Sequence, residues 1–237
     1  MDTPVLTTMV VLYATGLKMD TNILVRDLPL TENIIKIEKQ GVLKRGASKK
    51  DKIKHRTSTT PPAKRTTGFG HNSITLVVLS SGDGTLPSKE ITVKIFQNGV
   101  FHITGVLDEK YDRDVVNRLY THITTSCPTA IVEGTWDTTN RRVVLMNYKT
   151  KLHDIENLSR ETLSTTLRRN GYKTNYEPAV YPAVKLYFQG ERWIAKVFRT
   201  GNIILTGMTS HEECSRMVSA LEEALKPFLD SVKVSQF

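Results

Sequence analysis

The residue types that most often carry out chemistry are few in this 237-residue chain and do not gather along it. The six histidines are scattered, and the chain has two cysteines, Cys127 and Cys214, far apart from each other in the sequence. Two cysteines are too few for a disulfide framework or a zinc site, so we expect two reduced thiols. The acids from Asp108 to Asp114 begin a predicted helix, where carboxylates favour the positive end of the helix dipole. The sequence therefore predicts no catalytic centre, no metal and no cofactor, and we expect that the chain is not an enzyme.

A different kind of chemistry is indicated by a stretch that the chain contains twice. "VKIFQNGVFHITG" begins at Val93, and "AKVFRTGNIILTG" begins at Ala195, 102 positions later. A lysine beside an aromatic ring suits a ligand that is flat and carries charge at its edges. The alternative reading is that the two halves or a dimer partner bury these rings, or that the rings are simply exposed. The two copies agree at these positions: Lys94/Lys196, Phe96/Phe198, Gly99/Gly201, Thr104/Thr206 and Gly105/Gly207.

The register of this hairpin decides which side chains share a face. "QNG" and "RTG" permit either a two-residue turn or a three-residue loop that ends in a left-handed glycine. Thr200 favours the three-residue loop, because threonine rarely adopts a positive φ. In that register the apolar side chains share one face, which we expect to pack on helices: Val93, Ile95, Phe101 and Ile103, then Ala195, Val197, Ile203 and Leu205. The opposite face holds Lys94, Phe96, His102 and Thr104, matched by Lys196, Phe198, Ile204 and Thr206.

The elements around the hairpin are repeated as well. Each Thr-Gly pair is followed by an amphipathic helical pattern, from Val115 in the first copy and Met217 in the second. A strand running into a helix precedes each copy, in "MVVLYATGLKMDTNIL" and "VLMNYKTKLHDIENL", and a further strand follows, in "SITLVVL" and "AVKLY". We therefore predict an α+β fold of two pseudo-symmetric β-α-β-β-β-α repeats, residues 1–126 and 127–237, with an antiparallel sheet and the helices on one face.

The positive charge of the chain is concentrated in one segment. The formal net charge is +9, and between Lys44 and Arg65 nine basic residues accompany a single acid, Asp51. Residues from about 42 to 68 lack apolar periodicity and contain a Pro-Pro pair, so we expect a disordered basic insert within the first repeat. A solvated loop, a nuclear localisation signal and an arm that adds phosphate contacts are all open readings of this insert.

These features resemble the family of the TATA-box-binding protein. Two imperfect repeats, each with Phe-x-x-Gly-x-x-x-x-Thr-Gly before a long helix, are typical of that family. "YEPAVYPAVKLY" from Tyr176 is similar to the family's Tyr-Glu-Pro-x-x-Phe-Pro motif in the second repeat. The insert and the altered motifs resemble the divergent, viral versions found in large DNA viruses. The resemblance implies a saddle-shaped sheet, with helices on the convex face, that binds the DNA minor groove and kinks it with aromatic wedges.

The resemblance also assigns a DNA-binding face residue by residue. Phe96 and Phe198 match the inner wedge of each pair, and Tyr181 stands at the outer wedge of the second repeat. The outer wedge of the first repeat falls near His71, with Phe69 two residues earlier. The other positions on the DNA face are Val10, Leu145, Lys94, Thr104, Lys196, Ile204 and Thr206.

Several positions depart from the family pattern. Thr8 and Val143 replace the family's central asparagine pair, and Tyr187 replaces a phosphate-binding arginine. Lys94 and Lys196 stand where the family has leucines on the DNA face. We therefore expect a relaxed sequence preference and a greater reliance on charge.

The function that the resemblance implies is that of a transcription initiation factor that binds and bends promoter DNA and helps to recruit RNA polymerase. A factor similar to transcription factor IIB would dock near Glu177 and the loop "FQGER" from Phe188, with Trp193 as either an exposed anchor or a core residue. The alternative is a module of the same fold that binds proteins or nucleic acid non-specifically, without promoter recognition. We expect no small-molecule substrate, no membrane segment, and an intracellular location in the nucleus or a cytoplasmic viral factory.

Overall fold

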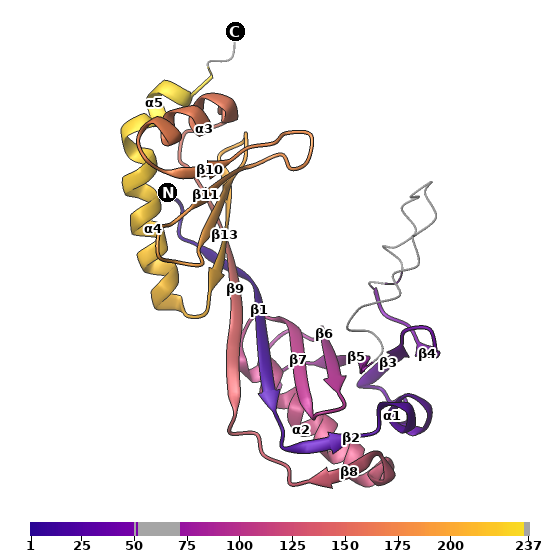
Figure 1. Cartoon of the computed structure of the whole chain (residues 1–237). Coiled ribbons are helices and arrows are strands. Elements are labelled where there is room, and N and C mark those ends of the chain that lie inside the picture. The colour runs from indigo at the N-terminus through magenta and orange to yellow at the C-terminus, as the bar shows by residue number, and fades with distance from the viewer. Residues whose placement is uncertain (50, 52–71, 235–237) are drawn as a thin grey trace. The chain divides into compact units, whose positions relative to one another are not determined.

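The computed structural model of the chain describes residues 1–49, 51 and 72–234 (Figure 1). The chain forms two compact units. Unit 1 consists of Met1–Met9 and Val143–Phe237, and unit 2 consists of Val10–Arg142. Most of the predicted basic insert, with His71 and Phe69, lies outside the described residues. No helix in the described part of the chain is long and apolar enough to cross a membrane.

Unit 2 contains an antiparallel sheet and two helices. Its strand order is β1-β7-β6-β5-β3-β4, and β2 pairs with β8 in a separate ribbon. The helices α1 and α2 pack on this sheet. The elements are β1 (Val5–Ala14, which begins in unit 1), β2 (Leu17–Met19), α1 (Thr21–Asp27), β3 (Ile34–Lys39), β4 (Leu43–Gly46), β5 (Ser73–Ser80), β6 (Lys89–Phe96), β7 (Val100–Val106), α2 (Glu109–Ser126), the short 3-10 turn η2 (Pro128–Ala130) and β8 (Ile131–Gly134).

Unit 1 repeats this plan. Its strand order is β10-β11-β12-β13-β9, and α4 lies along the sheet (Figure 1). The elements are β9 (Arg141–Lys151, which begins in unit 2), α3 (Arg160–Arg169), β10 (Lys173–Asn175), β11 (Val184–Tyr187), β12 (Ile194–Val197), β13 (Asn202–Met208), α4 (His211–Leu225), the turn η3 (Lys226–Phe228) and α5 (Leu229–Val232).

The predicted α+β class and the two repeated halves are confirmed, with more strands than the sequence pattern indicated. Each repeat contains one further strand after its first helix, β3 or β10. The first residues of the predicted disordered insert are also ordered, because β4 pairs with β3 in an antiparallel hairpin. The hairpin turns at Gly41, whose φ is +74°. A strand of four residues is held by its partner's hydrogen bonds rather than by apolar periodicity, which is why the pattern did not reveal it.

The predicted register of the duplicated hairpin is confirmed in both units. Val93 lies opposite Ile103 across β6 and β7, and Ala195 lies opposite Leu205 across β12 and β13. The two turn glycines have the same left-handed φ of +74°. In each turn the glycine N–H donates to the carbonyl of the phenylalanine three residues earlier, at 3.0 Å. All eight predicted helix-facing side chains are fully buried: Val93, Ile95, Phe101, Ile103, Ala195, Val197, Ile203 and Leu205.

One of the acids that begin α2 has a structural role that the sequence did not reveal. Asp112 is fully buried. Its carboxylate accepts a hydrogen bond of 2.6 Å from the Tyr13 hydroxyl on β1. It also accepts two bonds, of 2.7 and 3.0 Å, from the guanidinium of Arg141 on β9. Burial, followed by the bond to Asp112, raises the pKa of Tyr13. Asp112 therefore ties three elements of unit 2 together, beyond any contribution to the helix dipole.

Gly99→Ala tests whether the turn glycine is required by its surroundings as well as by its φ. A Cβ at position 99 would lie 1.9 Å from the carbonyl oxygen of Leu17, whereas a Cβ at Gly41 would meet no atom within 4 Å at the same φ. We expect Gly41→Ala to lower the free energy of unfolding by about 1–2 kcal/mol, the cost of left-handed backbone for alanine. Gly99→Ala should lower it distinctly more, measured by chemical denaturation. Equal losses would contradict the clash.

Asp112→Ala tests the contribution of the buried hydrogen bonds and ion pair that Asp112 forms with Tyr13 and Arg141. Removing one partner of a buried ion pair leaves the other without compensation, so we expect the free energy of unfolding to fall by about 3–5 kcal/mol. Glu109→Ala is the matched control, because Glu109 is exposed in the first turn of the same helix. Its loss should be no more than about 1 kcal/mol, the scale of a helix-dipole effect. Similar losses in the two variants would show that Asp112 acts only through the dipole.

Candidate nucleic-acid interface

In the part of the chain that the structure describes, each unit has one sheet face that its helices do not cover, which we call its open face. Side chains alternate along a strand, so residues next to the buried helix-facing positions belong to this face. In unit 2, Lys94 is exposed, and Phe96 is half-buried. In unit 1, Lys196 and Phe198 are both half-buried at the equivalent positions. Aromatic and basic side chains therefore occur on the open face of both units.

The open face of unit 1 contains a pair of aromatic rings. Phe198 follows the last residue of β12, and Tyr181 precedes β11. The pairing of Val184 with Val197 brings the two together. Their ring centroids lie 6.0 Å apart, with the planes at 61°, which is an edge-to-face contact. The inner and outer wedge positions predicted for the second repeat are thus in direct contact with each other.

Two lysines lie over the tyrosine ring of this aromatic pair. The ammonium nitrogens of Lys185 and Lys196 lie 5.2 and 5.8 Å from the centroid of the Tyr181 ring. Lys185 is directly opposite Lys196, and on the other side Lys196 is directly opposite Ile204, which in turn faces Lys149 on β9. The sequence analysis missed Lys149 and Lys185. The alternation of lysine with apolar or aromatic residues in "VKLY" and "NYKTK" was a signal that could have found them.

The open face of unit 2 differs in its neighbours. Lys94 lies between Thr75 on β5 and His102 on β7, and Thr104 lies opposite Thr92. Burial, together with the nearby Lys94 ammonium, lowers the pKa of His102. His102 is therefore neutral at pH 7, and it adds no positive charge to this face.

The ten residues predicted to contact DNA are divided between the units. Unit 2 holds Val10, Lys94, Phe96 and Thr104, and unit 1 holds Leu145, Tyr181, Lys196, Phe198, Ile204 and Thr206. Val10 has only 8% of its surface exposed, whereas Leu145, Ile204 and Thr206 are half-buried. Their contact with DNA stays a prediction, as does the outer wedge of the first repeat.

Trp193 does not form the exposed anchor that was one of its two predicted roles. Only 5% of its surface is exposed. Phe188 contacts it edge to face at 6.1 Å, and the guanidinium carbon of Arg216 on α4 lies 5.3 Å from its ring centroid. Trp193 is therefore a core residue covered by an arginine, which leaves Glu191 and Arg192 as exposed residues of the same loop.

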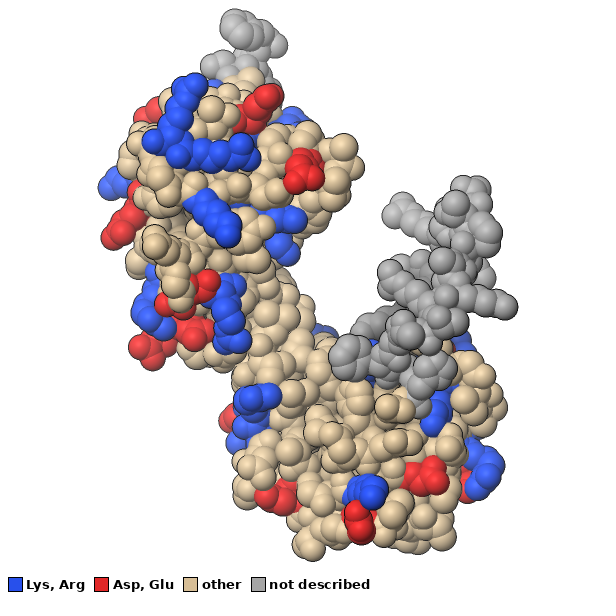
Figure 2. All heavy atoms as spheres, viewed as in Figure 1, with Lys and Arg blue, Asp and Glu red and all other residues tan. Residues whose placement is uncertain are grey.

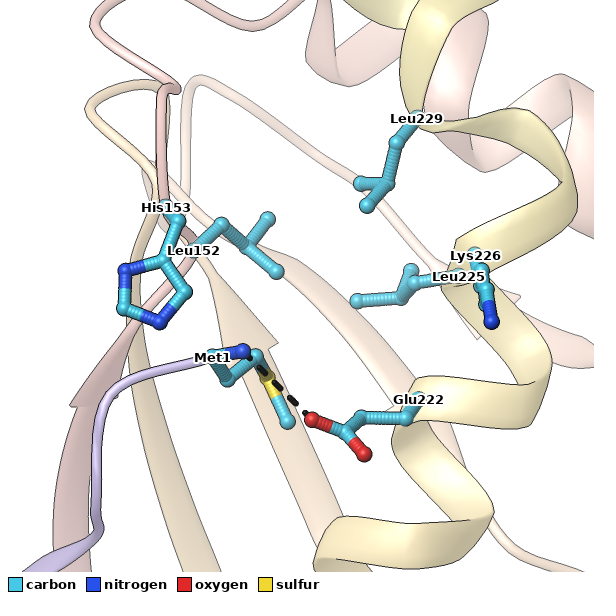
Figure 3. A pocket seen from close by; sticks show the side chains of 7 residues that line it. All are labelled: Met1, Leu152, His153, Glu222, Leu225, Lys226 and Leu229. Atoms are coloured by element: carbon cyan, nitrogen blue, oxygen red, sulfur yellow. Dashed lines mark hydrogen bonds and ion pairs between the residues drawn. The ribbon is translucent and has the colours of Figure 1, made fainter.

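A cavity of about 290 Å³ in unit 1 lies near α4 (Figure 3). The Met1 amino group forms an ion pair of 3.4 Å with Glu222, at the edge of an otherwise largely apolar lining. Its lining residues are Met1, Leu152, His153, Glu222, Leu225, Lys226 and Leu229. No group of three or more His, Cys, Asp or Glu side chains within the described ranges is arranged to hold a metal ion. The cavity thus offers space without a recognisable set of reacting groups.

Comparison with known proteins agrees with this fold. Residues 154–228 match the model of the family described as "Transcription factor TFIID (or TATA-binding protein, TBP)". The solved structure of Methanococcus jannaschii TBP is similar, with a TM-score of 0.59 and 15% sequence identity over 95% of this chain and 99% of that chain. No curated protein matches the sequence.

The fold is therefore that of the TATA-binding proteins. The second repeat carries the match to the TBP family model, and the resemblance to that family inferred from the sequence is confirmed.

A double-mutant cycle tests whether Tyr181 and Phe198 act as a pair. Aromatic pairs contribute about 0.5–1.5 kcal/mol beyond the area that they bury. We expect the losses in the free energy of unfolding from Tyr181→Ala and Phe198→Ala to differ from additivity by that amount. The control cycle combines Phe198→Ala with Val180→Ala, because Val180 is next to Tyr181 but 76% exposed. The control should be additive, and additivity in both cycles would contradict a contact between the rings.

Proposed function

We propose that this chain is a non-enzymatic transcription initiation factor that binds promoter DNA in the minor groove, bends it and helps to recruit RNA polymerase. The observation that supports the proposal most directly is the contact between Tyr181 and Phe198 on a sheet face that none of the described helices covers. Phe96 occupies the equivalent of Phe198 in the other repeat. Rigid rings in these positions suit insertion between base steps, which unstacks and kinks the duplex.

The other side chains of the open faces suit the minor groove. An A·T pair presents acceptors there, whereas a G·C pair adds the donor N2 amino group of guanine. The hydroxyls of Thr104 and Thr206 can donate to those acceptors, and Ile204 is an apolar contact that an A·T step tolerates. The two threonines occupy equivalent positions of the two repeats, each opposite a residue of the preceding strand. A preference for A·T-rich DNA follows from these residue types.

The lysines next to the wedges increase the electrostatic share of the binding free energy relative to the share from base contacts. Contacts to phosphates position a protein on DNA without reading the base sequence. Lys94 and Lys196 therefore favour a weaker sequence preference than an apolar pair would give. The same charges would hold the chain on DNA while it samples base steps that can be kinked.

Protein partners would dock on exposed loop residues of the second repeat. Glu177 and the residues around Glu191 and Arg192 are exposed on the second repeat. We propose this region as the contact for a factor similar to transcription factor IIB, and through it for the polymerase machinery. The proposed place of action is wherever the target DNA is transcribed, the nucleus or a cytoplasmic viral factory.

Fluorescence-detected bending of end-labelled duplexes tests the function. At fixed, moderate salt we expect the wild-type chain to bend an A·T-rich duplex more than a G·C-rich duplex of equal length. The Phe96→Ala/Phe198→Ala double variant should lose the bending while it retains much of the charge-driven binding. Tyr120→Ala is the matched control, because Tyr120 is an exposed aromatic residue on α2 that stacks on Trp136.

Two outcomes would overturn this proposal. Bending that survives in the double variant would exclude the phenylalanines as wedges. Binding without bending in the wild-type chain would favour the alternative, a module of the same fold that binds nucleic acid or proteins non-specifically. An equal loss of bending in Tyr120→Ala would indicate a general defect in folding instead of a local one.

A further inference from the structure

We infer that the open face of unit 1 is a binding surface for the phosphate backbone of duplex DNA, and that it holds DNA irrespective of the base sequence. This inference rests on the proposed function, since it assigns a backbone-binding role to the same face. It depends on lysines that lie in the strands of unit 1: Lys149, Lys151, Lys173, Lys185 and Lys196.

The strands of unit 1 contain basic side chains but no acidic ones. From Val143 onward, strands β9 to β13 contain these five lysines and no aspartate or glutamate. The acids of the unit lie in its helices and loops, four of them in α4. In the space-filling view, basic and acidic side chains are interspersed over the face of this unit that the view shows (Figure 2). The strands of unit 1 therefore carry positive charge alone, whereas its helices and loops carry charges of both signs.

The five lysines have no counter-ions of their own. None of them forms an ion pair with any other described residue. Lys185 and Lys196 are directly opposite each other on adjacent strands, an arrangement that destabilises a sheet when the charges are alike. Their ammonium groups and that of Lys173 lie over tyrosine rings, which attract cations. A bound polyanion would relieve the repulsion that remains.

Among the described residues of unit 2, two lysines at the β3–β4 end of the equivalent face are neutralised by acids. Lys36 on β3 is nearly buried and pairs with Glu38 at 2.6 Å and with Asp51 at 2.8 Å. Lys44 on β4 pairs with the same Asp51 at 3.2 Å. The hydrogen bond from Lys36, the strongest of these interactions, holds the pKa of the Asp51 carboxyl far below its usual value. Asp51 is therefore ionised, and its negative charge offsets the positive charge of the lysines around it. Lys94, the counterpart of Lys196, has uncharged residues on either side.

The shape of the lysine row suits a phosphate backbone. Lys185, Lys196 and Lys149 lie on one transverse line across four adjacent strands. With adjacent strands about 4.8 Å apart, the row is about 14 Å long. Along one strand of duplex DNA, neighbouring phosphates follow each other at about 3.4 Å of helix axis. The row is therefore long enough to face several successive phosphates. The rings of Tyr181 and Phe198 beside the row suit nucleic-acid bases and sugars better than an acidic polypeptide.

The test compares two triple variants of the full chain. Lys149→Gln/Lys185→Gln/Lys196→Gln removes the row. Arg168→Gln/Arg169→Gln/Lys226→Gln removes the same charge from exposed positions at the ends of α3 and α4 in the same unit. Binding to a G·C-rich and to an A·T-rich duplex is measured over a range of salt concentrations. A log–log salt slope changes by about 0.9 for each phosphate no longer neutralised.

We expect the row variant to lose up to about 2.7 from the magnitude of that slope on both duplexes, and the control variant to lose less than about 1. Thermal melting of the row variant should occur at or above the wild-type temperature, because the opposed charges are gone. The Lys→Arg version of the row should retain the wild-type slope. Equal slopes in the two triple variants, or an unchanged slope in the row variant, would overturn the inference.

The outcomes separate this inference from the proposed function. If the wild-type chain bends A·T-rich DNA but the two triple variants have equal slopes, only the inference fails. If the wild-type chain bends no duplex but the slopes differ as expected, the proposed function fails and the backbone surface stands. A wild-type chain that binds no duplex would overturn both. Displacement of DNA by poly-glutamate as effectively as by unlabelled duplex at equal charge would replace DNA with an acidic protein as the ligand.

Discussion

The left-handed glycine at the same place in each hairpin is the constraint on which the rest of the structure depends. Gly99 and Gly201 close three-residue turns, and those turns fix which residues of the flanking strands lie opposite each other. A slip of one residue would exchange the two faces of a strand. Lysines and phenylalanines would then enter the core, and valines and isoleucines would leave it. The core and the candidate interface are thus set by the same two backbone positions.

The two faces of each sheet meet opposite physical requirements within one strand. Towards the helices, side chains are apolar and fully buried, and this burial stabilises the unit. On the open face of unit 1, Lys185 and Lys196 are held near each other at a cost, which the Tyr181 ring partly offsets. A sheet selected for stability alone would place an acid among these lysines. The absence of acids from the strands of unit 1 indicates that a property other than stability has shaped this face.

The sequence predicted the parts of the fold that follow local patterns. Both hairpins were correct because strict alternation and a turn glycine specify them. β3 was missed because Lys36 and Lys39 interrupt its apolar pattern. Lys39 is buried through bonds to Thr21 and Asn22, partners that only the fold brings near. Trp193 and Asp112 became core residues through Arg216 and Arg141, which are also distant in the sequence. In the candidate site, single positions such as Lys196 could be predicted from the repeat and the resemblance. The lysine row could not be predicted, because it depends on the register of four adjacent strands.

The assignment of the first nine residues to unit 1 has a consequence for biosynthesis. Unit 2 is one continuous stretch that is complete once Arg142 has left the ribosome. The first nine residues, by contrast, find their hydrogen bonds on β9: Asp2 donates to the carbonyl of Lys151, and Thr7 donates to that of Asn147. Those partners are translated more than a hundred residues later. During synthesis residues 1–9 therefore remain without these hydrogen-bond partners until β9 has been translated.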